Sequence, residues 1–156
     1  MSNPLKCVID MGEYLHNNIQ QRTEELIRAA SDARKQAYAP YSKFRIGAAV
    51  LTTNGKIFTG CNVENVSYGL SICAERVAVG NMAASGEREI AAVAVFSNGG
   101  VFPCGACLQV IQEFSGKEPP LIIAAGTDGS VQMKSLDQCL PCAFKDFEGE
   151  GQEVIG

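Results

Sequence analysis

The stretch that decides the fold runs from Ile90 to Ala125, and it reads IAAVAVFSNGGVFPCGACLQVIQEFSGKEPPLIIAA. It begins with a continuously apolar run, 90–97, and ends with another, 121–125. Runs of this kind are typical of strands that are buried on both faces of a sheet. Between them, residues 104–114 are expected to form a helix. A strand, a helix and a second strand in this order predict a parallel strand pair joined by a right-handed crossover.

The flanking residues supply the remaining elements. Asn54-Gly55 separates two β-rich runs, 44–53 and 56–60, and an Asn-Gly pair in this setting is the strongest short signal for a hairpin. Thr23 can cap the first helix of the chain, because its hydroxyl can accept a bond from a free backbone N–H group. The other elements expected are helices over 23–37, 71–84 and 135–140 and a strand over 130–134.

These elements predict an α/β fold, a three-layer α/β/α sandwich whose mixed sheet has about five strands and carries helices on both faces. We expect one catalytic domain over residues 23–156, preceded by an N-terminal arm over residues 1–22. In such sheets, sites form where helices follow the C-terminal ends of parallel strands. Both Cys73 and Cys104 stand at expected helix starts.

Composition limits the possible partners. The chain has 156 residues, of which 46% are hydrophobic, and it carries a net charge of -4. An acidic protein without a basic stripe is a poor match for nucleic acid or for an anionic membrane. No apolar run approaches the roughly 20 residues of a membrane span, and residues 1–18 do not resemble a secretory signal. We therefore expect a cytoplasmic protein with no nucleic-acid and no membrane partner.

Cysteine is unusually frequent in this chain. An odd number of cysteines without an export signal is a poor disulfide framework, so metal binding or catalysis explains them better. His16 is the single histidine, and a zinc site would therefore have to be built from thiolates. The seven cysteines are Cys7, Cys61, Cys73, Cys104, Cys107, Cys139 and Cys142.

Spacing alone leaves three uses for these cysteines. Cys104 and Cys107 could join Cys139 and Cys142 in a closed structural zinc site, and the protein would then be a zinc or interaction module without enzymatic activity. The same first pair with Cys73 would make a three-thiolate zinc site whose fourth position is open for water. Cys104 and Cys107 could also form a redox dithiol that needs no metal.

The surroundings of the cysteines favour the three-thiolate site. The turn 139–142 lacks the glycine that usually loops a chain around a metal, and residues 97–100 separate the strand from the CxxC pair, which a redox site would place at the strand end. Glu75 lies two residues after Cys73, close enough to contact a water on the metal. Arg76 and the helix dipoles can offset the charge of three thiolates. Without a site, Glu75 would be an ordinary first-turn carboxylate and Arg76 a surface cation.

Six short motifs then occur in order within residues 23–145. They are PYSKF at 40–44, IGAA at 46–49, GCNVEN at 60–65, CAER at 73–76, PCGAC at 103–107 and LPCAF at 140–144. With them the chain resembles the small, homotetrameric, zinc-dependent cytidine deaminases. Zinc deaminases as a class combine a three-ligand cysteine or histidine site with a nearby glutamate that is not a ligand and a downstream PCxxC motif.

The resemblance implies a hydrolase that converts cytidine or deoxycytidine to uridine or deoxyuridine and ammonia, in pyrimidine salvage. It implies one zinc ion per chain, held by Cys73, Cys104 and Cys107. Glu75 would take a proton from water and hand it to N3 of the base, and would then also protonate the departing amino group, and Arg76 would support the thiolates. The substrate contacts implied are Phe44 on the pyrimidine, Asn62 and Glu64 at the ribose 3′-hydroxyl, and Ala74, Tyr68 and Phe144.

Two positions depart from the family pattern. Leu108 stands where an arginine is usual, and Arg45 stands where proline or another small residue is common. The exact nucleoside is therefore open, and a modified cytidine or a blasticidin-like nucleoside is the alternative substrate. The carboxylate of Glu64 would repel a 3′-phosphodiester, so a free nucleoside is expected over a polynucleotide.

Phe144 follows the last expected helix, and the residues alone leave two positions open for it. The ring could pack into the core of its own chain. The resemblance implies instead that Tyr68 and Phe144 complete the site of a neighbouring subunit in a homotetramer, where a covering ring would exclude water.

Overall fold

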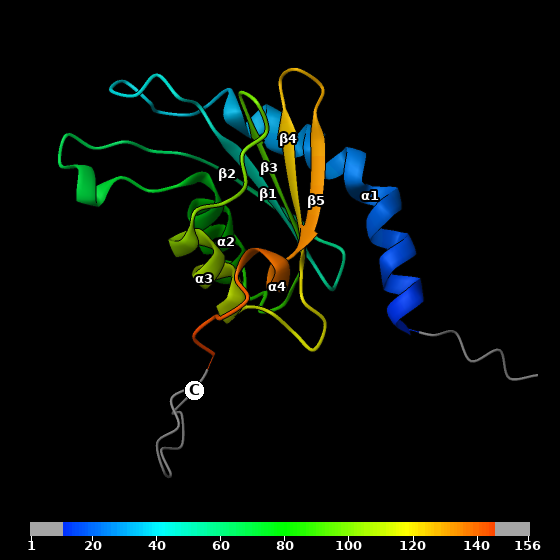
Figure 1. Cartoon of the computed structure of the whole chain (residues 1–156). Helices are drawn as coiled ribbons and strands as arrows, with labels where there is room; N and C mark the ends of the chain where they lie inside the picture. Colours follow the sequence, from blue (N-terminus) through cyan, green and yellow to red (C-terminus); the bar gives the residue numbers. More distant parts are fainter. Residues whose placement is uncertain (1–10, 146–156) are drawn as a thin grey trace, which may run out of the picture.

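The computed structural model describes residues 11–145, with side chains from residue 22 onward (Figure 1). Its elements follow one another in the expected order of helices and strands. They are α1 (Met11–Arg34), β1 (Gly47–Thr52), β2 (Ile57–Cys61), the 3-10 turn η1 (Tyr68–Leu70), α2 (Ala74–Ala84), β3 (Ile90–Ser97), α3 (Gly105–Glu113), β4 (Leu121–Gly126), β5 (Val131–Ser135) and α4 (Leu136–Cys139).

The strands form one mixed sheet in the order β2-β1-β3-β4-β5. β1 is antiparallel to both β2 and β3, and β5 is antiparallel to β4. β3 and β4 are parallel, with Ala92 opposite Leu121 and Ser97 opposite Gly126, so the parallel pair predicted from residues 90–125 is confirmed. The hairpin is also confirmed, and Gly55 supplies its turn with a φ of 81°.

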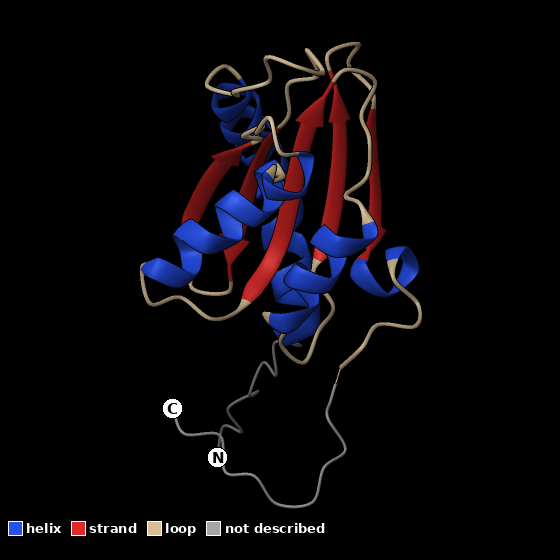
Figure 2. Ribbon diagram, turned by 90° about the vertical axis from the view of Figure 1, so that its left-hand side faces the viewer, coloured by secondary structure: helices blue, strands red, loops and turns tan. Residues whose placement is uncertain are grey.

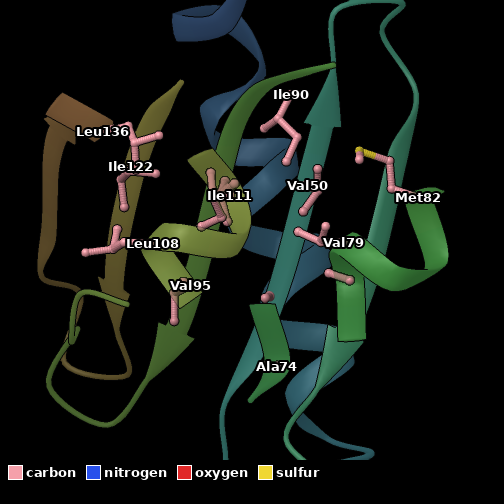
Figure 3. Close-up of a cluster of buried hydrophobic side chains, with 13 residues drawn as sticks. Val50, Ala74, Val79, Met82, Ile90, Val95, Leu108, Ile111, Ile122 and Leu136 are labelled. Atoms are coloured by element: carbon pink, nitrogen blue, oxygen red, sulfur yellow. The ribbon is translucent and has the colours of Figure 1, made fainter. Parts of the chain in front are cut away.

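Helices cover both faces of this sheet (Figure 2). α1 packs on one face, where Leu26 and Ala30 contact the inward side chains of Ala49 and Leu51. The other face carries α2, α3 and α4, and their apolar side chains pack against Val50, Val95 and Ile122 among others (Figure 3). Successive residues of β1 therefore point to opposite layers, which is why this strand is buried along its whole length. The predicted three-layer α/β/α fold is confirmed.

The first helix is longer than the sequence predicted. It begins at Met11, so Thr23 lies inside it and does not cap it, and it ends at Arg34, before the predicted end at Ala37. Residues 11–21 are mostly polar, and the few apolar residues at helical spacing among them, Met11, Tyr14, Leu15 and Ile19, give only a weak helix signal. The boundary proposed after residue 22 falls within α1. Between residues 11 and 145, no helix has both the length and the apolar content needed to cross a membrane.

Two glycines bring the helices unusually close to the sheet. A Cβ atom at Gly47 would lie 2.0 Å from the carbonyl oxygen of Ala30 in α1. A Cβ atom at Gly60 would lie 2.4 Å from the backbone nitrogen of Ala78 and 2.6 Å from the carbonyl oxygen of Ala74 in α2. The bare backbone at Gly60 thus sets how closely the first turn of α2 approaches β2.

Gly60→Ala is expected to lower the free energy of unfolding by about 1–3 kcal/mol, because the added methyl group pushes α2 away from β2. Urea denaturation measures this loss. Gly80→Ala is the matched control, since Gly80 also belongs to α2 but has nothing within 4 Å of an added Cβ atom. The free energy of unfolding of that variant should stay the same or rise by up to about 1 kcal/mol. Equal losses in the two variants would contradict this explanation of the close approach.

Candidate active site

Three cysteines meet where α2 and α3 begin. Cys73 is the N-cap residue of α2, Cys104 is the N-cap residue of α3, and Cys107 lies in the first turn of α3. Their sulfur atoms all lie within 4.8 Å of one another, and those of Cys104 and Cys107 are 3.6 Å apart. The N-terminal end of each helix carries a partial positive charge, which suits a group of sulfur atoms that hold a metal cation as thiolates.

Cys73 and Cys107 share a negative charge in this arrangement. A hydrogen bond from the Cys107 thiol, helped by Arg76, lowers the pKa of Cys73 to about 5. The pKa of Cys107 is raised, because its thiol donates that bond and is buried, and because the charge of Glu75 lies nearby. The pair thus favours one negative charge near Cys73, and a bound cation would replace the proton that remains between the two sulfur atoms.

Arg76 supports the thiolate from the other side. Its Nη2 atom lies 3.9 Å from the Cys73 Sγ atom and donates a hydrogen bond of 3.2 Å to the carbonyl oxygen of Ser71. The thiolate raises the pKa of Arg76 in return. Arg76 is thus held beside the sulfur cluster by the backbone that precedes α2, as expected for a residue that offsets the charge of metal-bound thiolates.

Glu75 is buried beside the same sulfur atoms, with 4% of its surface exposed. Burial is the main cause that raises its pKa, and the charge of Cys73 adds to the effect. Within the described residues, its Oε2 atom has no hydrogen-bond partner. A buried carboxylate oxygen is rarely left without a partner, so this atom points to a polar group that belongs in the site.

This donor set fits zinc. Three cysteine sulfurs and an open fourth position, with an unpartnered carboxylate beside them, match a catalytic site that holds zinc with three protein ligands and a water. Cys139 and Cys142 are not part of the metal-ligand group found among the described residues. Cys139 lies on α4 and packs partly against the core, and Cys142 is exposed. The geometry thus favours the three-thiolate set over the four-cysteine alternative.

Glu64 organises the loop that precedes β1. Its carboxylate accepts hydrogen bonds from the backbone N–H groups of Tyr41 and Ser42, at 2.9 and 3.2 Å, and from the Ser42 hydroxyl. These bonds, the one from the hydroxyl above all, lower the pKa of Glu64. The Ser42 hydroxyl oxygen accepts in turn from the N–H of Phe44 at 3.0 Å. Glu64 is therefore a fixed negative charge that is tied to the Phe44 loop.

Asn62 holds the same loop from its other end. Its amide accepts a hydrogen bond of 2.8 Å from the Ile46 N–H and donates one of 2.9 Å to the carbonyl oxygen of Phe44. Between these anchors, Lys43 adopts a left-handed conformation with a φ of 60°. Such a conformation costs a residue with a side chain about 1–2 kcal/mol, and the surrounding hydrogen bonds hold it in place. Phe44 therefore stands on a strained but well-anchored loop.

The remaining expected contact residues lie in different environments. Ala74 is fully buried and its methyl group belongs to the core, so only its backbone is available to a substrate. Tyr68 and Phe144 are exposed over 77% and 59% of their surfaces. Phe144 thus does not pack into the core of its own chain, which was one of its two expected positions.

The two departures from the family pattern are resolved differently. Leu108 is buried in the same core cluster as Ile111 and Ile122, so an apolar side chain suits this position (Figure 3). Arg45 is exposed, and its Nη1 atom lies 3.5 Å from the carbonyl oxygen of Lys35. It lines an open pocket of about 330 Å³ with Tyr38 and Lys43.

The sequence alone assigned no role to two residues that form hydrogen bonds with the expected site residues. Ser42 belongs to the PYSKF motif, and its hydroxyl links Glu64 to Phe44. Gln109 lies two residues after Cys107, and its side chain contacts the backbone of Phe144. The motif position could have indicated Ser42. No local pattern indicates Gln109, because its partner lies 35 residues further along the chain.

Comparison with known proteins agrees with this site. The family model described as "Cytidine and deoxycytidylate deaminase zinc-binding region" matches residues 20–122. A cytidine deaminase from Sporosarcina psychrophila is 43% identical over 123 residues, which cover 78% of this chain and 90% of that protein. A probable cytidine deaminase from Dictyostelium discoideum is also 43% identical, over 80% of this chain and 85% of its own length.

Solved structures give the same result. The cytidine deaminase from Burkholderia pseudomallei superposes with a TM-score of 0.73 at 48% identity, over 78% of this chain and 98% of that one. The enzyme from Mycobacterium tuberculosis superposes with a TM-score of 0.66 at 37% identity, over 78% and 96% of the two chains. The fold, the zinc-binding region and the relatives all agree, and the chain belongs to the zinc-dependent cytidine and deoxycytidylate deaminase family.

Proposed function

We propose that this protein is a zinc-dependent hydrolase that deaminates cytidine and deoxycytidine. One water is consumed, the bond between C4 and the exocyclic nitrogen breaks, and uridine or deoxyuridine and ammonia leave. The observation that carries the proposal is the group of three sulfur atoms within 4.8 Å of one another, beside a buried Glu75 whose Oε2 atom lacks a partner in the described chain. Cys73, Cys104 and Cys107 would hold zinc here, and zinc would supply the activated water that adds to C4 at neutral pH.

Glu75 moves the protons of this reaction. Its carboxylate accepts one proton from the attacking water and passes it to N3 of the base as negative charge builds there. It then takes the second proton from the oxygen that has added to C4 and gives it to the departing amino group, so that the C4 carbonyl forms as ammonia leaves. A raised pKa suits both steps, because the carboxyl group has to hold the proton and release it again near neutral pH. Burial supplies that shift, and it also keeps bulk water away from the proton.

The Phe44 loop binds the nucleoside. The ring of Phe44 stacks on the pyrimidine, while Asn62 and Glu64 bind the ribose 3′-hydroxyl. The fixed negative charge of Glu64 repels a phosphate at that position, and the chain as a whole has a net charge of -4. A free nucleoside is therefore the preferred substrate, and a nucleotide or polynucleotide is disfavoured.

The test of this proposal is the rate of deamination over a panel of bases, nucleosides and nucleotides. The fall of ultraviolet absorbance on conversion of cytosine to uracil gives the rate. Cytidine or deoxycytidine should react much faster than free cytosine and than the 5′-monophosphate. No turnover of any cytosine compound by zinc-loaded protein would overturn the proposal, and equal rates on cytosine and cytidine would show that the sugar is not recognised. A much faster modified cytidine would move the substrate assignment to that compound.

Ser42→Ala is expected to weaken nucleoside binding, because it removes the hydroxyl that links Glu64 to the Phe44 backbone. Loss of this link between polar groups should raise KM by about three- to ten-fold. Ser67→Ala is a control on the exposed loop that precedes η1, where the serine side chain makes no capping hydrogen bond. Steady-state kinetics on cytidine measure both. An unchanged KM in the Ser42 variant would contradict a positioning role for its hydroxyl.

The proposed assembly is a homotetramer. Large apolar side chains are exposed on the segments 38–41 and 63–72, and in Figure 1 the loop between β2 and α2 extends away from the sheet. The rings of Tyr41 and Tyr68 lie in edge-to-face contact there, with their centroids 6.3 Å apart. Exposed apolar patches of this kind are typical of protein interfaces. Tyr68 and Phe144 then complete the site of a neighbouring subunit.

Light scattering should give about four times the chain mass of 16.6 kDa. Phe144→Ala should raise KM for cytidine while leaving the unfolding midpoint nearly unchanged, since the ring is exposed in its own chain. A fully active monomer would contradict the assembly and would leave the zinc chemistry intact. Seven cysteines, an odd number, are a poor framework for disulfides, and we assign the enzyme to pyrimidine salvage in the cytoplasm.

A further inference from the structure

Gln109 makes two hydrogen bonds to the backbone of one distant residue. Its Nε2 atom donates to the carbonyl oxygen of Phe144 at 2.7 Å, and its Oε1 atom accepts from the Phe144 N–H at 3.2 Å. The side-chain amide thus pairs with residue 144 as a neighbouring strand would. Two bonds in opposite directions fix both the position and the rotation of that backbone unit.

The segment held in this way lies beyond the last helix. α4 ends at Cys139, and residues 140–145 form no further helix or strand. The nearby ion pair between Lys145 and Asp137 has an N–O distance of 3.9 Å and is exposed on both sides, so it contributes little. The Phe144 ring, in contrast, stays largely exposed while its backbone is anchored.

The helix that provides the anchor is the one that carries two of the three sulfur ligands. Gln109 lies on α3, two residues after Cys107, and Leu108 and Ile111 of α3 are buried in the core. The position of Phe144 is therefore set relative to a helix of the core and not by the loop itself. An anchored ring loses less conformational entropy when it packs on a partner than a ring on a free chain end would.

We infer that Gln109 is a positioning residue, which holds Phe144 in the orientation in which its ring covers the nucleoside site of a neighbouring subunit. This inference rests on the proposed function, because the covering ring has a purpose only at a nucleoside site. Gln109 itself touches neither substrate nor metal. Its contribution is to present a preorganised ring, so its loss affects the binding of the nucleoside more than the chemical step.

Gln109→Glu is the sharpest variant. The new side chain has the same length, but it cannot donate to the Phe144 carbonyl oxygen and places a negative charge against it. KM for cytidine should rise about three- to ten-fold, as expected for the loss of one or two hydrogen bonds, with kcat changed less than about two-fold. Zinc content and tetramer mass should stay the same. Gln112→Glu adds the same charge one turn further along α3, away from any described bond to Phe144, and should leave KM unchanged.

A double-mutant cycle separates positioning from a general structural effect. In a Phe144→Ala background, Gln109→Glu should raise KM no further, because the ring that it positions is already absent. Amide hydrogen exchange gives a readout that does not depend on activity. The N–H of Phe144 should exchange faster in Gln109→Glu than in the wild type and in Gln112→Glu, while exchange in β3 stays slow in all three.

Three results would overturn the inference. They are an unchanged KM in Gln109→Glu while Phe144→Ala raises it, KM effects that simply add in the double variant, and unchanged exchange at Phe144. Failure of the proposed function is a different result, since the wild-type protein itself would then not deaminate any cytosine nucleoside. The exchange experiment would still report in that case whether Gln109 anchors the segment.

Discussion

Glu75→Gln is expected to fold and to bind zinc as the wild type does, and to lose turnover of cytidine by about 10²–10⁴-fold. The amide has nearly the same size and shape as the carboxyl group, so the side chain still fills the buried space beside the sulfur atoms. It cannot accept a proton from water and return it to the base. Turnover at saturating cytidine, together with metal content and a thermal unfolding midpoint, measures the three properties.

Glu87→Gln is the matched control for this variant. Glu87 is the other largely buried glutamate among the described residues, and it pairs with Lys56 at 2.6 Å and with Asn54 at 2.9 Å. Its replacement should leave turnover at the wild-type level, although stability falls slightly. Near-normal turnover in Glu75→Gln would contradict the proton-transfer role. An equal loss in both variants would show that buried charge and not proton transfer is responsible.

Cys104→Ser is expected to abolish zinc binding and with it activity. Metal content should fall from about one zinc per chain to nearly zero, because a serine hydroxyl does not replace the thiolate that zinc requires. Cys139→Ser should retain both zinc and turnover, since Cys139 lies outside the metal-ligand group of the described residues. Metal analysis after dialysis compares the two. Zinc retained in the first variant and lost in the second would restore the four-cysteine structural site.

The sequence of residues 90–125 predicted β3, α3 and β4 correctly, because the patterns that indicate these elements are local. A short continuous apolar run that is followed by glycines is typical of a strand buried on both faces, and β3 covers the predicted residues. The start of α1 could not be predicted from the same kind of signal. Residues 11–21 carry Met11, Tyr14, Leu15 and Ile19 at helical spacing, but these four residues among polar ones are too weak a pattern to separate a helix from an irregular arm.

The sequence predicted more about some residues of the site than about others. The spacing of Cys73, Cys104 and Cys107 was visible in the sequence. Only the structure, in which the first turns of α2 and α3 lie side by side, favours this set over one that uses the later CxxC pair. Asn62 and Glu64 were expected to face a sugar. That both also hold the backbone of the Phe44 loop follows from contacts across 16 to 23 residues, which no motif encodes.

Leu108 shows how a departure from a family pattern can be misread from sequence. An arginine is usual at this position in the family, and its absence left the exact nucleoside open. In the structure, position 108 faces the core, and Arg76 is held beside the Cys73 sulfur by its bond to Ser71. The charge of the thiolates is therefore balanced by a residue that the chain has kept, and Leu108 instead adds an apolar contact between α3 and the sheet.

The central claim is that three cysteines hold a zinc ion on which cytidine deamination depends. The most direct test strips the metal with a chelator and returns zinc in steps, while the fall in cytidine absorbance is followed at each step. The account predicts no turnover without zinc and a linear recovery that ends at about one zinc per chain. Full turnover by the zinc-free protein, or stoichiometric zinc binding without any deamination of cytidine, would contradict it.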